Sequence, residues 1–449
     1  MRSDSTDVAL AEIAADQPNA IAAGPFGSNL VSRDYVDSGT PVIRGQNLAG
    51  RWVAGEFVYV SDAKAAQLRS NTACPGDIVF TQRGTLGQVS IVPQGSYPSY
   101  IVSQSQMKMT VDARKADYRF VYYACSAPDF VAQVQNNAVA AGVPHINLGI
   151  LRALRIPLPA LTCQIKAVEV LSALDDRIDL LRQTNATLES IAQALFKSWF
   201  IDFDPVRAKA EGREPDGMDA ATAALFPSEF EESALGAIPK GWAPACVGDL
   251  ADVTDCLHSK KPDLLNEGRP YLQLNNIRDD GLLDVSHLAF VCDSDYAKWT
   301  SRIEVREGDC VVTNVGRVGA VAQIPPRFLA AMGRNMTAIR PRADKPFPTI
   351  LIELLLSSWM RAEIERQTDV GTILNALNVR SIPKLRFVLA PNAVLVAAES
   401  VLRPLRAAME SNLARASQLA KIRDTLLPRL ISGKLRLPEA QEQIDEVCA

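Results

Sequence analysis

The sequence contains no long uninterrupted apolar run. The apolar stretch from Ile350 to Met360 is shorter than the roughly 18 residues that a membrane span requires, and it contains Glu353. The N-terminal segment is acidic and polar, and it lacks the basic and apolar regions of a secretory signal. We therefore expect no membrane span and a cytoplasmic location.

Cysteine and histidine are scarce and follow no metal-binding or redox spacing. The chain has 8 cysteines and 3 histidines, and no two cysteines form the C-x-x-C pair that is typical of zinc sites and redox motifs. A disulfide framework is not expected in a cytoplasmic protein of this size. The sequence therefore predicts no metal site and thiols that stay reduced.

Recognisable catalytic motifs are also missing. The phosphate-binding loop G-x-x-x-x-G-K-[ST] is absent, and Asp204-Pro205-Val206 does not complete the Asn/Asp-Pro-Pro-aromatic tetrad of amino-methyltransferases. Cys256 and His258 are close in sequence, but a Cys-x-His pair alone is a weak indication of a nucleophile and its base. We expect the chain to have no catalytic activity of its own.

The net charge of −4 does not suggest a protein that binds a polyanion over its whole surface. The charge is uneven, because residues 201–240 hold nine acidic against four basic side chains and the rest of the chain is nearly neutral. Binding to nucleic acid would then depend on local basic faces outside this acidic segment. The charge balance permits nucleic-acid binding but does not indicate it.

The most informative positive feature is an internal repeat with an offset of about 230 residues. Each copy contains a Gly-Asp turn, an apolar strand and two further glycines, at Pro75–Gly87 and at Glu307–Gly319. Two other pairs of segments correspond: 41–48 with 270–277, and 147–157 with 378–388. Glycine turns that bound short apolar strands predict two globular units of α/β (α+β) class. The copies differ most at their starts. The second copy begins with Val247–Leu250, and the corresponding segment of the first, Val8–Ile13, has a different sequence.

Each copy ends in a long amphipathic segment, at about residues 162–200 and 393–432. In the first segment, apolar residues alternate at spacings of three and four over about four heptads, which is the coiled-coil pattern. We expect the two helices to pair as an antiparallel coiled coil with a pseudo-two-fold axis, holding the two globular units at opposite ends. The residues expected in the helix pair or in partner docking are Leu174, Ile178, Leu181, Leu188, Leu195, Trp199, Phe200, Leu405, Met409, Leu419 and Leu426.

Three features of the helices allow alternative interpretations. Asn185, in the apolar seam, either fixes the register of the pair or meets water near a helix bend. Pro428 is expected to kink or end the second helix. An aromatic cluster at the end of the first helix either docks a partner or packs the two helical regions on each other; it consists of Phe196, Trp199, Phe200 and Phe203.

These patterns together predict the organisation of the chain. A globular unit is expected first, then a helix, an acidic linker, a second globular unit, a second helix and a tail. The predicted boundaries are 1–160, 161–203, 204–240, 241–391, 392–436 and 437–449.

At several of these positions the sequence resembles the specificity subunits of type I restriction-modification systems. Leu195–Gly212 is similar to the central conserved region of that family, and Leu426–Leu435 is similar to its distal conserved region. Gly24–Ser28, together with Pro41–Gly45, resembles the start of a family recognition domain. The likeness extends from about residue 20 to about residue 437.

The resemblance implies that each globular unit is a target recognition domain for one short half-site of double-stranded DNA, with the two helices as a spacer. It implies assembly with two modification (methyltransferase) subunits, and with two restriction subunits in the complex that cleaves DNA. The partners would methylate adenine N6 and would hold S-adenosylmethionine, ATP and Mg²⁺, so this chain needs no cofactor. Because the two copies differ in sequence, we expect an asymmetric, bipartite site.

Base recognition requires side chains with two-point hydrogen bonding on exposed loops, such as arginine for guanine and asparagine or glutamine for adenine. The two copies carry such residues at matching loops, and this recurrence favours base contact over a solvated or loop-capping role. The candidates in the first copy are Arg44, Gln46, Asn47, Gln82, Arg83, Thr85, Gln104, Gln106 and His145. Those in the second are Gln273, Asn275, Asn276, Arg278, Asn314, Arg317, Arg334, Asn335 and Asn375. Lys260 and Lys261 suit phosphate contacts better.

Two other functions remain open from the sequence. The chain could be the DNA-recognition module of another defence or modification assembly, and a neighbouring gene for a modification subunit would argue against this. It could instead be an enzyme built on Cys256 and His258, which loss of turnover in Cys256→Ala with intact DNA binding would support.

Overall fold

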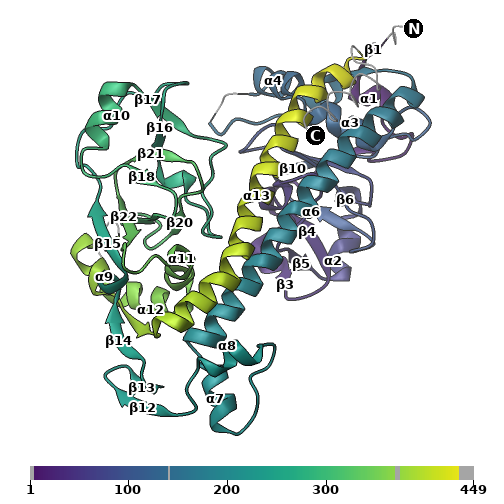
Figure 1. The fold of residues 1–449 in the computed structure, drawn as a ribbon. Coiled ribbons are helices and arrows are strands. Elements are labelled where there is room, and N and C mark those ends of the chain that lie inside the picture. The colour runs from purple at the N-terminus through teal and green to yellow at the C-terminus, as the bar shows by residue number, and fades with distance from the viewer. Residues whose placement is uncertain (1–4, 140–141, 370–374, 434–449) are drawn as a thin grey trace. The chain divides into compact units, whose positions relative to one another are not determined.

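The computed structural model describes residues 5–139, 142–369 and 375–433, and these form two compact units (Figure 1). The first unit contains the residues up to Ile178 and those from Gln418 onward, and the second contains Asp179–Ser417. Each unit combines a globular part of mixed helices and strands with segments of the two long helices. The predicted fold class is therefore confirmed.

The sheets of the first unit are short-stranded and mostly antiparallel. The strand orders are β3-β5-β4-β9-β6, β2-β10-β7-β8 and β1-β11. The strands are β1 (Thr6–Ala9), β2 (Ile21–Ala23), β3 (Tyr35–Val36), β4 (Thr40–Ile43), β5 (Val58–Val60), β6 (Thr72–Ala73), β7 (Ile78–Thr81), β8 (Val89–Ile91), β9 (Tyr100–Val102), β10 (Gln106–Met109) and β11 (Arg155–Leu158).

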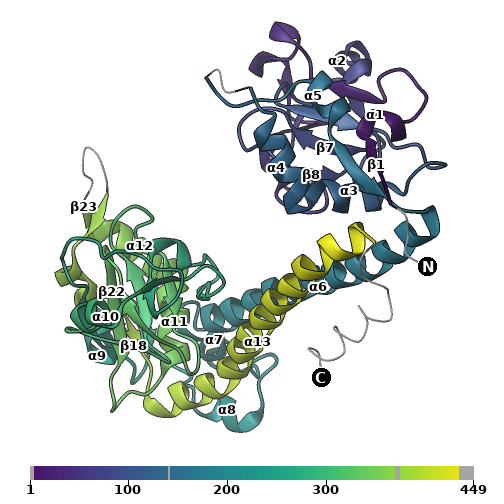
Figure 2. The ribbon, with the colours of Figure 1, turned by 90° about the horizontal axis from the view of Figure 1, so that it is seen from above.

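Helices of the first unit pack beside the sheet that contains β7. Figure 2 shows α3 and α4 next to β7 and β8, and buried residues of α3 share one core with Phe80 and Met107. The helices of this globular part are α1 (Leu10–Ile13), α2 (Asp62–Gln67), α3 (Tyr118–Ser126), α4 (Pro128–Asn136) and α5 (Leu148–Ala153).

The second unit has the same kinds of sheet. The strand orders are β17-β16-β21-β18, β15-β22-β19-β20, β14-β25, β12-β13 and β23-β24. The strands are β12 (Phe230–Ser233), β13 (Gly236–Pro239), β14 (Ala243–Cys246), β15 (Ala251–Asp255), β16 (Arg269–Leu272), β17 (Ala289–Val291), β18 (Val305–Arg306), β19 (Cys310–Thr313), β20 (Val321–Gln323), β21 (Leu329–Met332), β22 (Met336–Pro341), β23 (Thr368–Asp369), β24 (Ala376–Leu377) and β25 (Arg386–Leu389).

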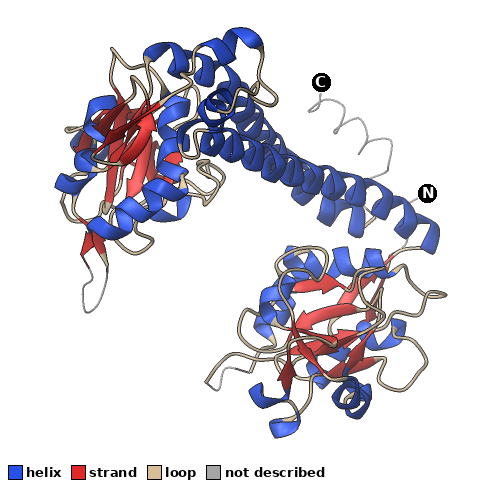
Figure 3. Cartoon of the chain, turned by 90° about the horizontal axis from the view of Figure 1, so that it is seen from below, coloured by secondary structure: helices blue, strands red, loops and turns tan. Residues whose placement is uncertain are grey.

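Helices again flank the sheets of the second unit, as the colouring by secondary structure in Figure 3 shows. The helices of its globular part and of the segment before it are α7 (Asp204–Ala210), α8 (Ala220–Ala224), α9 (Val247–Leu250), α10 (Asp293–Trp299), α11 (Pro348–Leu356) and α12 (Ser358–Gln367). A 3₁₀ helix, Val379–Lys384, stands where the first unit has α5.

The internal repeat is visible in the sheet topology. The order β2-β10-β7-β8 recurs as β15-β22-β19-β20, and β5-β4-β9-β6 recurs as β17-β16-β21-β18. In each copy the pair β4–β9 or β16–β21 is parallel, whereas its flanking pairs are antiparallel. The starts of the copies also correspond, because β1 and α1 pair and pack like β14 and α9 despite their different sequences.

The apolar strands that mark the repeat are buried on both faces. In β7, Ile78 and Phe80 face the core shared with the helices, whereas Val79 faces a second core between the two larger sheets. In β19, Val312 likewise belongs to the core shared with the helices, and Val311 belongs to a second core. Alternate residues of a strand point to opposite faces, so a continuous apolar run is what a strand between two cores requires.

The long helices are α6 (Leu161–Phe200) and α13 (Asn392–Ile431), each of 40 residues. Within each unit they pack antiparallel: the start of α6 lies against the end of α13 in the first unit, and the reverse holds in the second (Figure 1). α13 continues past Pro428, and Gly433 follows with a positive φ of 68°, which suits a glycine just after a helix end.

The expected seam residues are buried or half-buried. The seven buried ones are Leu174, Ile178, Leu181, Trp199, Phe200, Met409 and Leu426. Asn185 makes two bonds to the partner helix: its amide donates to the Met409 carbonyl and accepts from the Asn412 amide, both at 2.9 Å. These bonds support the register-fixing interpretation of Asn185.

The acidic segment that composition predicts as a linker carries structure of its own. It forms α7, α8 and the hairpin β12–β13, and Phe226 is buried against Trp199 with 5.3 Å between ring centroids. The aromatic cluster Phe196, Trp199, Phe200 and Phe203 is buried in the same core, together with Trp242. The packing alternative for this cluster is therefore the one the structure supports.

The predicted tail, 437–449, lies outside the described residues, as does the end of the predicted distal region. No helix among the described residues is long and apolar enough to cross a membrane.

Candidate nucleic-acid interface

In the first unit, backbone hydrogen bonds join the loops that carry the candidate residues. The Gln82 N–H donates to the Ser105 carbonyl at 2.7 Å, and the Gln82 carbonyl accepts from the Ile146 N–H at 3.0 Å. The Ser103 N–H donates to the Ile43 carbonyl at 2.9 Å. These bonds bring together the loops that follow β4, β7, β9 and α4.

The second unit uses the same scheme at equivalent positions. The Asn314 N–H donates to the Asn335 carbonyl at 2.8 Å, and the Asn314 carbonyl accepts from the Leu377 N–H at 2.9 Å. The Gly333 N–H donates to the Leu272 carbonyl at 3.0 Å. Each unit therefore presents one face of four loops on a common backbone framework, which we call the loop face of that unit.

A buried asparagine shapes the first turn of each loop face. Asn47 accepts the N–H of Arg44 at 2.9 Å and donates to two carbonyls of the following loop at 2.9 and 3.0 Å. Asn276 accepts the N–H of Gln273 at 2.8 Å and donates to two carbonyls at 2.9 and 3.3 Å. Since both copies keep this residue for the same bonds, it supports the turn.

The aspartate of the Gly-Asp turn also has the same structural role in both copies. Asp77 and Asp309 each accept the backbone N–H of the residue three positions earlier, at 2.9 Å. Each also meets a cation on the neighbouring strand: Lys108 lies 3.4 Å from Asp77 and Arg340 lies 2.6 Å from Asp309. The aspartate therefore joins the turn to the sheet in both units.

Four of the candidate base-contacting residues are buried, which corrects the expectation for them. Asn47, Gln106, Asn276 and Asn314 are exposed by 1%, 1%, 0% and 6%. Gln106 accepts from the Ser103 hydroxyl, and Asn314 bonds to Leu377 and Thr337. Contact with a base would require breaking these internal bonds in the core, so these amides support the loops instead.

The other candidates are half-buried or exposed. Those that are half-buried are Arg44, Gln82, His145, Gln273 and Asn335. Those that are exposed are Gln46, Arg83, Thr85, Gln104, Lys260, Lys261, Asn275, Arg278, Arg317, Arg334 and Asn375. Arg83 and His145 are adjacent through a β-bridge, and the Arg83 side chain has no hydrogen bond or ion pair among the described residues.

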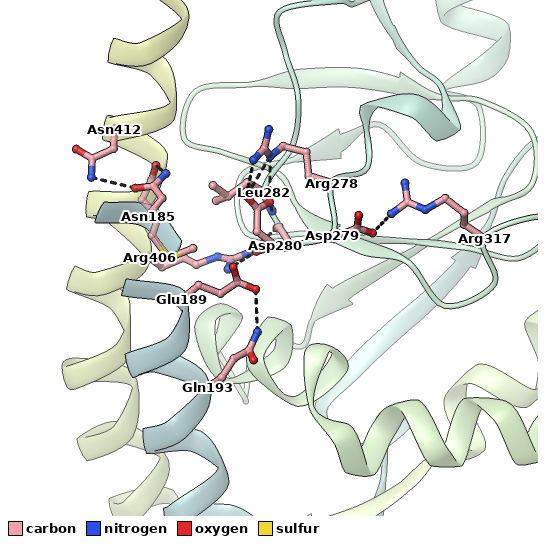
Figure 4. A network of polar contacts seen from close by, with 12 residues as sticks. Asn185, Glu189, Gln193, Arg278, Asp279, Asp280, Leu282, Arg317, Arg406 and Asn412 are labelled. Atoms are coloured by element: carbon pink, nitrogen blue, oxygen red, sulfur yellow. Dashed lines mark hydrogen bonds and ion pairs between the residues drawn. The ribbon is translucent and has the colours of Figure 1, made fainter. Parts of the chain in front are cut away.

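Two exposed arginines of the second loop face are paired with acids, as Figure 4 shows. Arg278 binds both carboxylate oxygens of Asp280 at distances between 2.6 and 3.1 Å. Arg317 forms an ion pair with Asp279 and donates to the Ile277 carbonyl at 3.0 Å. Both guanidinium groups are thereby oriented before any ligand arrives, and their charge is partly neutralised.

Cys256 and His258 lie together with Asp255 at the end of β15. Their ligand atoms are within 4.8 Å of one another, and the His258 Nε2 is 2.7 Å from the Asp255 carboxylate. Burial raises the pKa of the Cys256 thiol, and the Arg302 guanidinium lies 3.6 Å from Asp255. A thiol that burial keeps protonated is a poor nucleophile. The Arg302 cation beside Asp255 disfavours binding of a metal ion by that carboxylate.

The sequence patterns did not single out an exposed aromatic residue in the loop after β2, which is bonded to the first loop face. Phe26 is 92% exposed in a loop held by Gln104, which donates to the Leu30 carbonyl at 2.9 Å, and by the Gly24 N–H, which donates to Gln106. A phenylalanine in this position can contact a thymine methyl group or a base face. The motif Gly24–Ser28 was the available signal, but it did not single out this side chain.

Residues 32–190 match the family model described as the type I restriction modification DNA specificity domain. The HindI specificity subunit of Haemophilus influenzae is 25% identical over 337 residues, covering 65% of this chain and 71% of that protein. The MjaIX specificity subunit of Methanocaldococcus jannaschii is 23% identical over 431 residues, covering 93% of this chain and 92% of its own.

A solved structure has the same fold. The S subunit of a type I restriction-modification system from M. genitalium aligns over 96% of both chains with a TM-score of 0.55 at 15% sequence identity. The similarity therefore covers both copies of the repeat and both long helices.

Proposed function

We propose that this chain is a specificity subunit of the type I restriction-modification kind, and that it directs its complex to an asymmetric, bipartite DNA sequence. Each unit contacts one half-site through its loop face. The observation that carries the proposal is the shared backbone framework of the two loop faces, which holds different side chains at equivalent positions. A constant framework with variable side chains is what two domains with different half-sites require.

Several of the differences between the copies fall on exposed or half-buried positions. Arg83 of the first unit corresponds to Val315 of the second, and Thr85 corresponds to Arg317. The residues common to both copies, such as Asn47 and Asn276, are buried. The asparagine that shapes the first turn is therefore kept in both copies, whereas exposed residues that could contact bases have diverged, and this supports two unlike half-sites.

The partners follow from the same proposal. The relatives are named specificity subunits of type I restriction enzymes, so we propose that this chain assembles with two modification subunits and, for cleavage, with two restriction subunits. S-adenosylmethionine, ATP and Mg²⁺ would be held by those partners, and the chain itself would supply no catalytic group. Its location would be the cytoplasm, where the DNA is.

The decisive experiment is a genome-wide map of methylated bases in a host that expresses this chain with its modification partner. We expect a two-part motif with a constant gap and unlike halves, which disappears when this chain is deleted. The absence of any motif, with both proteins present and folded, would remove the claim that this chain directs a methyltransferase. It would favour a recognition module of another defence assembly.

A further inference from the structure

One loop of each unit connects its loop face to the helix pair. It follows the first turn of the loop face and occupies residues 49–54 in the first unit and 278–284 in the second. The two loops are equivalent, because the Arg51 carbonyl accepts the N–H of Ile91 at 2.8 Å and the Gly281 carbonyl accepts the N–H of Gln323 at 2.9 Å. Ile91 and Gln323 are the last residues of the corresponding strands β8 and β20.

In the second unit, Arg406 of α13 holds this loop. Its guanidinium donates to the Asp280 carbonyl at 3.1 Å and to the Gly281 carbonyl, and it lies 3.8 Å from the Glu353 carboxylate of α11. The side chains of Arg406 and Glu353 are 3% and 2% exposed. A Cβ atom on Gly281 would lie 2.6 Å from the guanidinium, so glycine permits this close approach.

The same loop holds the exposed arginines of the second loop face (Figure 4). Asp280 orients Arg278, Asp279 orients Arg317, and the Ile277 carbonyl accepts a second bond from Arg317. A shift of the Asp280–Gly281 backbone would therefore move both guanidinium groups. Arg406 thus acts on the loop face from the helix without lying on that face itself.

In the first unit, the contact is made with the opposite polarity. Arg51 of the loop forms an ion pair with Asp176 of α6. The preceding helix residue, Asp175, accepts from the Tyr123 hydroxyl and from Arg423 of α13, both at 2.7 Å. Asp175 and Arg406 stand at the same place along their 40-residue helices. The helix is anionic at this point in one unit and cationic in the other, yet the same loop is held.

We propose that Arg406 and the Arg51–Asp176 pair are positioning residues for DNA recognition: each fixes the loop face of its own unit on the helix pair and so sets that unit's base preference. This inference rests on the proposed function. The two loop contacts come from adjacent positions of the repeat, Asp176 in α6 and Arg406 in α13, and they have reversed charges. A residue simply inherited from duplication would keep its place and its charge, so this arrangement indicates that the contact itself is required.

The test uses the full chain with its modification partner and compares methylation maps of Arg406→Met, Asp176→Asn and the unaltered protein. Arg406→Met should lower discrimination between the right and the wrong base about tenfold at one or two positions of one half-site, because a misplaced arginine loses its two-point contact. Asp176→Asn should do the same in the other half-site. Arg403→Met, which removes an exposed cation from the same helix, should leave the motif unchanged.

The methylation maps of the variants separate a positioning role from a purely stabilising one. Relaxation of a different half-site by each variant supports the proposal, and a partial effect in Arg406→Lys would show that the guanidinium geometry matters. Uniformly weaker methylation with unchanged base preference would mean a stabilising role only and would overturn it. Asp176 is 65% exposed, so Asp176→Asn keeps the proposal testable if Arg406→Met does not fold. If the unaltered protein produces no two-part motif, the proposed function itself has failed.

Discussion

At the scale of single residues, adjacent polar side chains of the loop faces have different roles. Asn276 is fully buried and bonded to three backbone groups, whereas its neighbour Asn275 is exposed. Asn47 and Gln46 differ in the same way. Residue type alone suits either role, because an amide that binds adenine is equally able to bind a backbone turn.

The first prediction concerns the buried asparagines. Asn276→Ala should lower the free energy of unfolding by about 2–4 kcal/mol, because it leaves buried backbone groups without partners. Asn275→Ala, one residue away, should change it by less than about 0.5 kcal/mol and act on DNA specificity instead. Urea denaturation followed by tryptophan fluorescence measures both, and equal losses in the two variants would contradict the assignment.

The second prediction concerns Arg83, the exposed arginine beside His145. Arg83→Ala should weaken binding by about 1–3 kcal/mol and relax one base of one half-site if its contact is bidentate. Arg114→Ala is the matched control, since this side chain is 80% exposed but paired with Asp112 in its own turn. A loss for Arg83→Ala that is the same for all DNA sequences would instead indicate a phosphate contact.

The third prediction concerns pH. Burial raises the pKa of Glu353 to about 7, with Arg406 opposing and Glu189 adding to the shift. A carboxyl group whose pKa is higher in the folded chain contributes stability that is complete below about pH 4 and is lost as pH rises through about 7. Between about pH 5 and pH 8, the protein should lose on the order of 2–3 kcal/mol that Glu353→Gln does not lose. Parallel stability curves for the two proteins would refute this.

At the scale of secondary-structure elements, the long helices belong to the cores of both units. Leu171 and Leu430 are buried with the sheet residues of the first unit, and Phe196 and Leu395 with those of the second. Helix burial of this kind stabilises each globular part as well as the pair. Each globular part and its segments of the two helices therefore form one folded unit.

The fourth prediction concerns the seam. Asn185 and Asn412 should show a coupling free energy of about 0.5–1 kcal/mol in a double-mutant cycle with alanine, because each satisfies the other across the helix pair. A cycle between Ser190 and Asn412 serves as the control, since Ser190 bonds to its own helix at the Ala186 carbonyl. Equal coupling in both cycles would argue against a register role for Asn185.

At the scale of the whole molecule, the cations available to DNA are unevenly divided. Arg278 and Arg317 are already paired with aspartates, whereas Arg334 of the same loop face and Lys260 and Lys261 of the segment after β15 are exposed. Phosphate contacts in the second half-site would then come mainly from the unpaired group. The acidic residues between 204 and 240 lie on elements of the second unit that are separate from its loop face.

The fifth prediction concerns the spacer. One heptad inserted after Ile178 in α6 and another after Ser417 in α13, at the boundary of the two units, leave the contacts within each unit intact. The insertions add about 10 Å of helix, or about three base pairs of DNA. The methylation map should show a longer gap with unchanged half-sites. Altered half-sites with an unchanged gap would mean that the helices do not set the spacing.

The sequence by itself determined the two copies, the paired helices and the loops that carry candidate residues. Sequence patterns predict these features: the heptad spacing predicts α6, glycine turns bound β7 and β19, and a constant offset relates the two copies. Such patterns depend on the order of residues along the chain, so they can be recognised from the sequence alone. The acidic composition of residues 204–240 predicted a linker. The structure gives this segment helices and a hairpin, because its buried apolar residues pack onto the core of the second unit.

Only the tertiary structure decided which candidates are free to meet DNA. The burial of Asn314, the pairing of Arg317 with Asp279 and the contact of Arg406 with Gly281 all join residues that are distant in sequence. Hydrogen-bond partners and burial arise when strands, loops and helices pack together, and no periodicity in the chain encodes them. The physical reason is that an exposed amide and a buried amide differ in their surroundings and not in their chemistry.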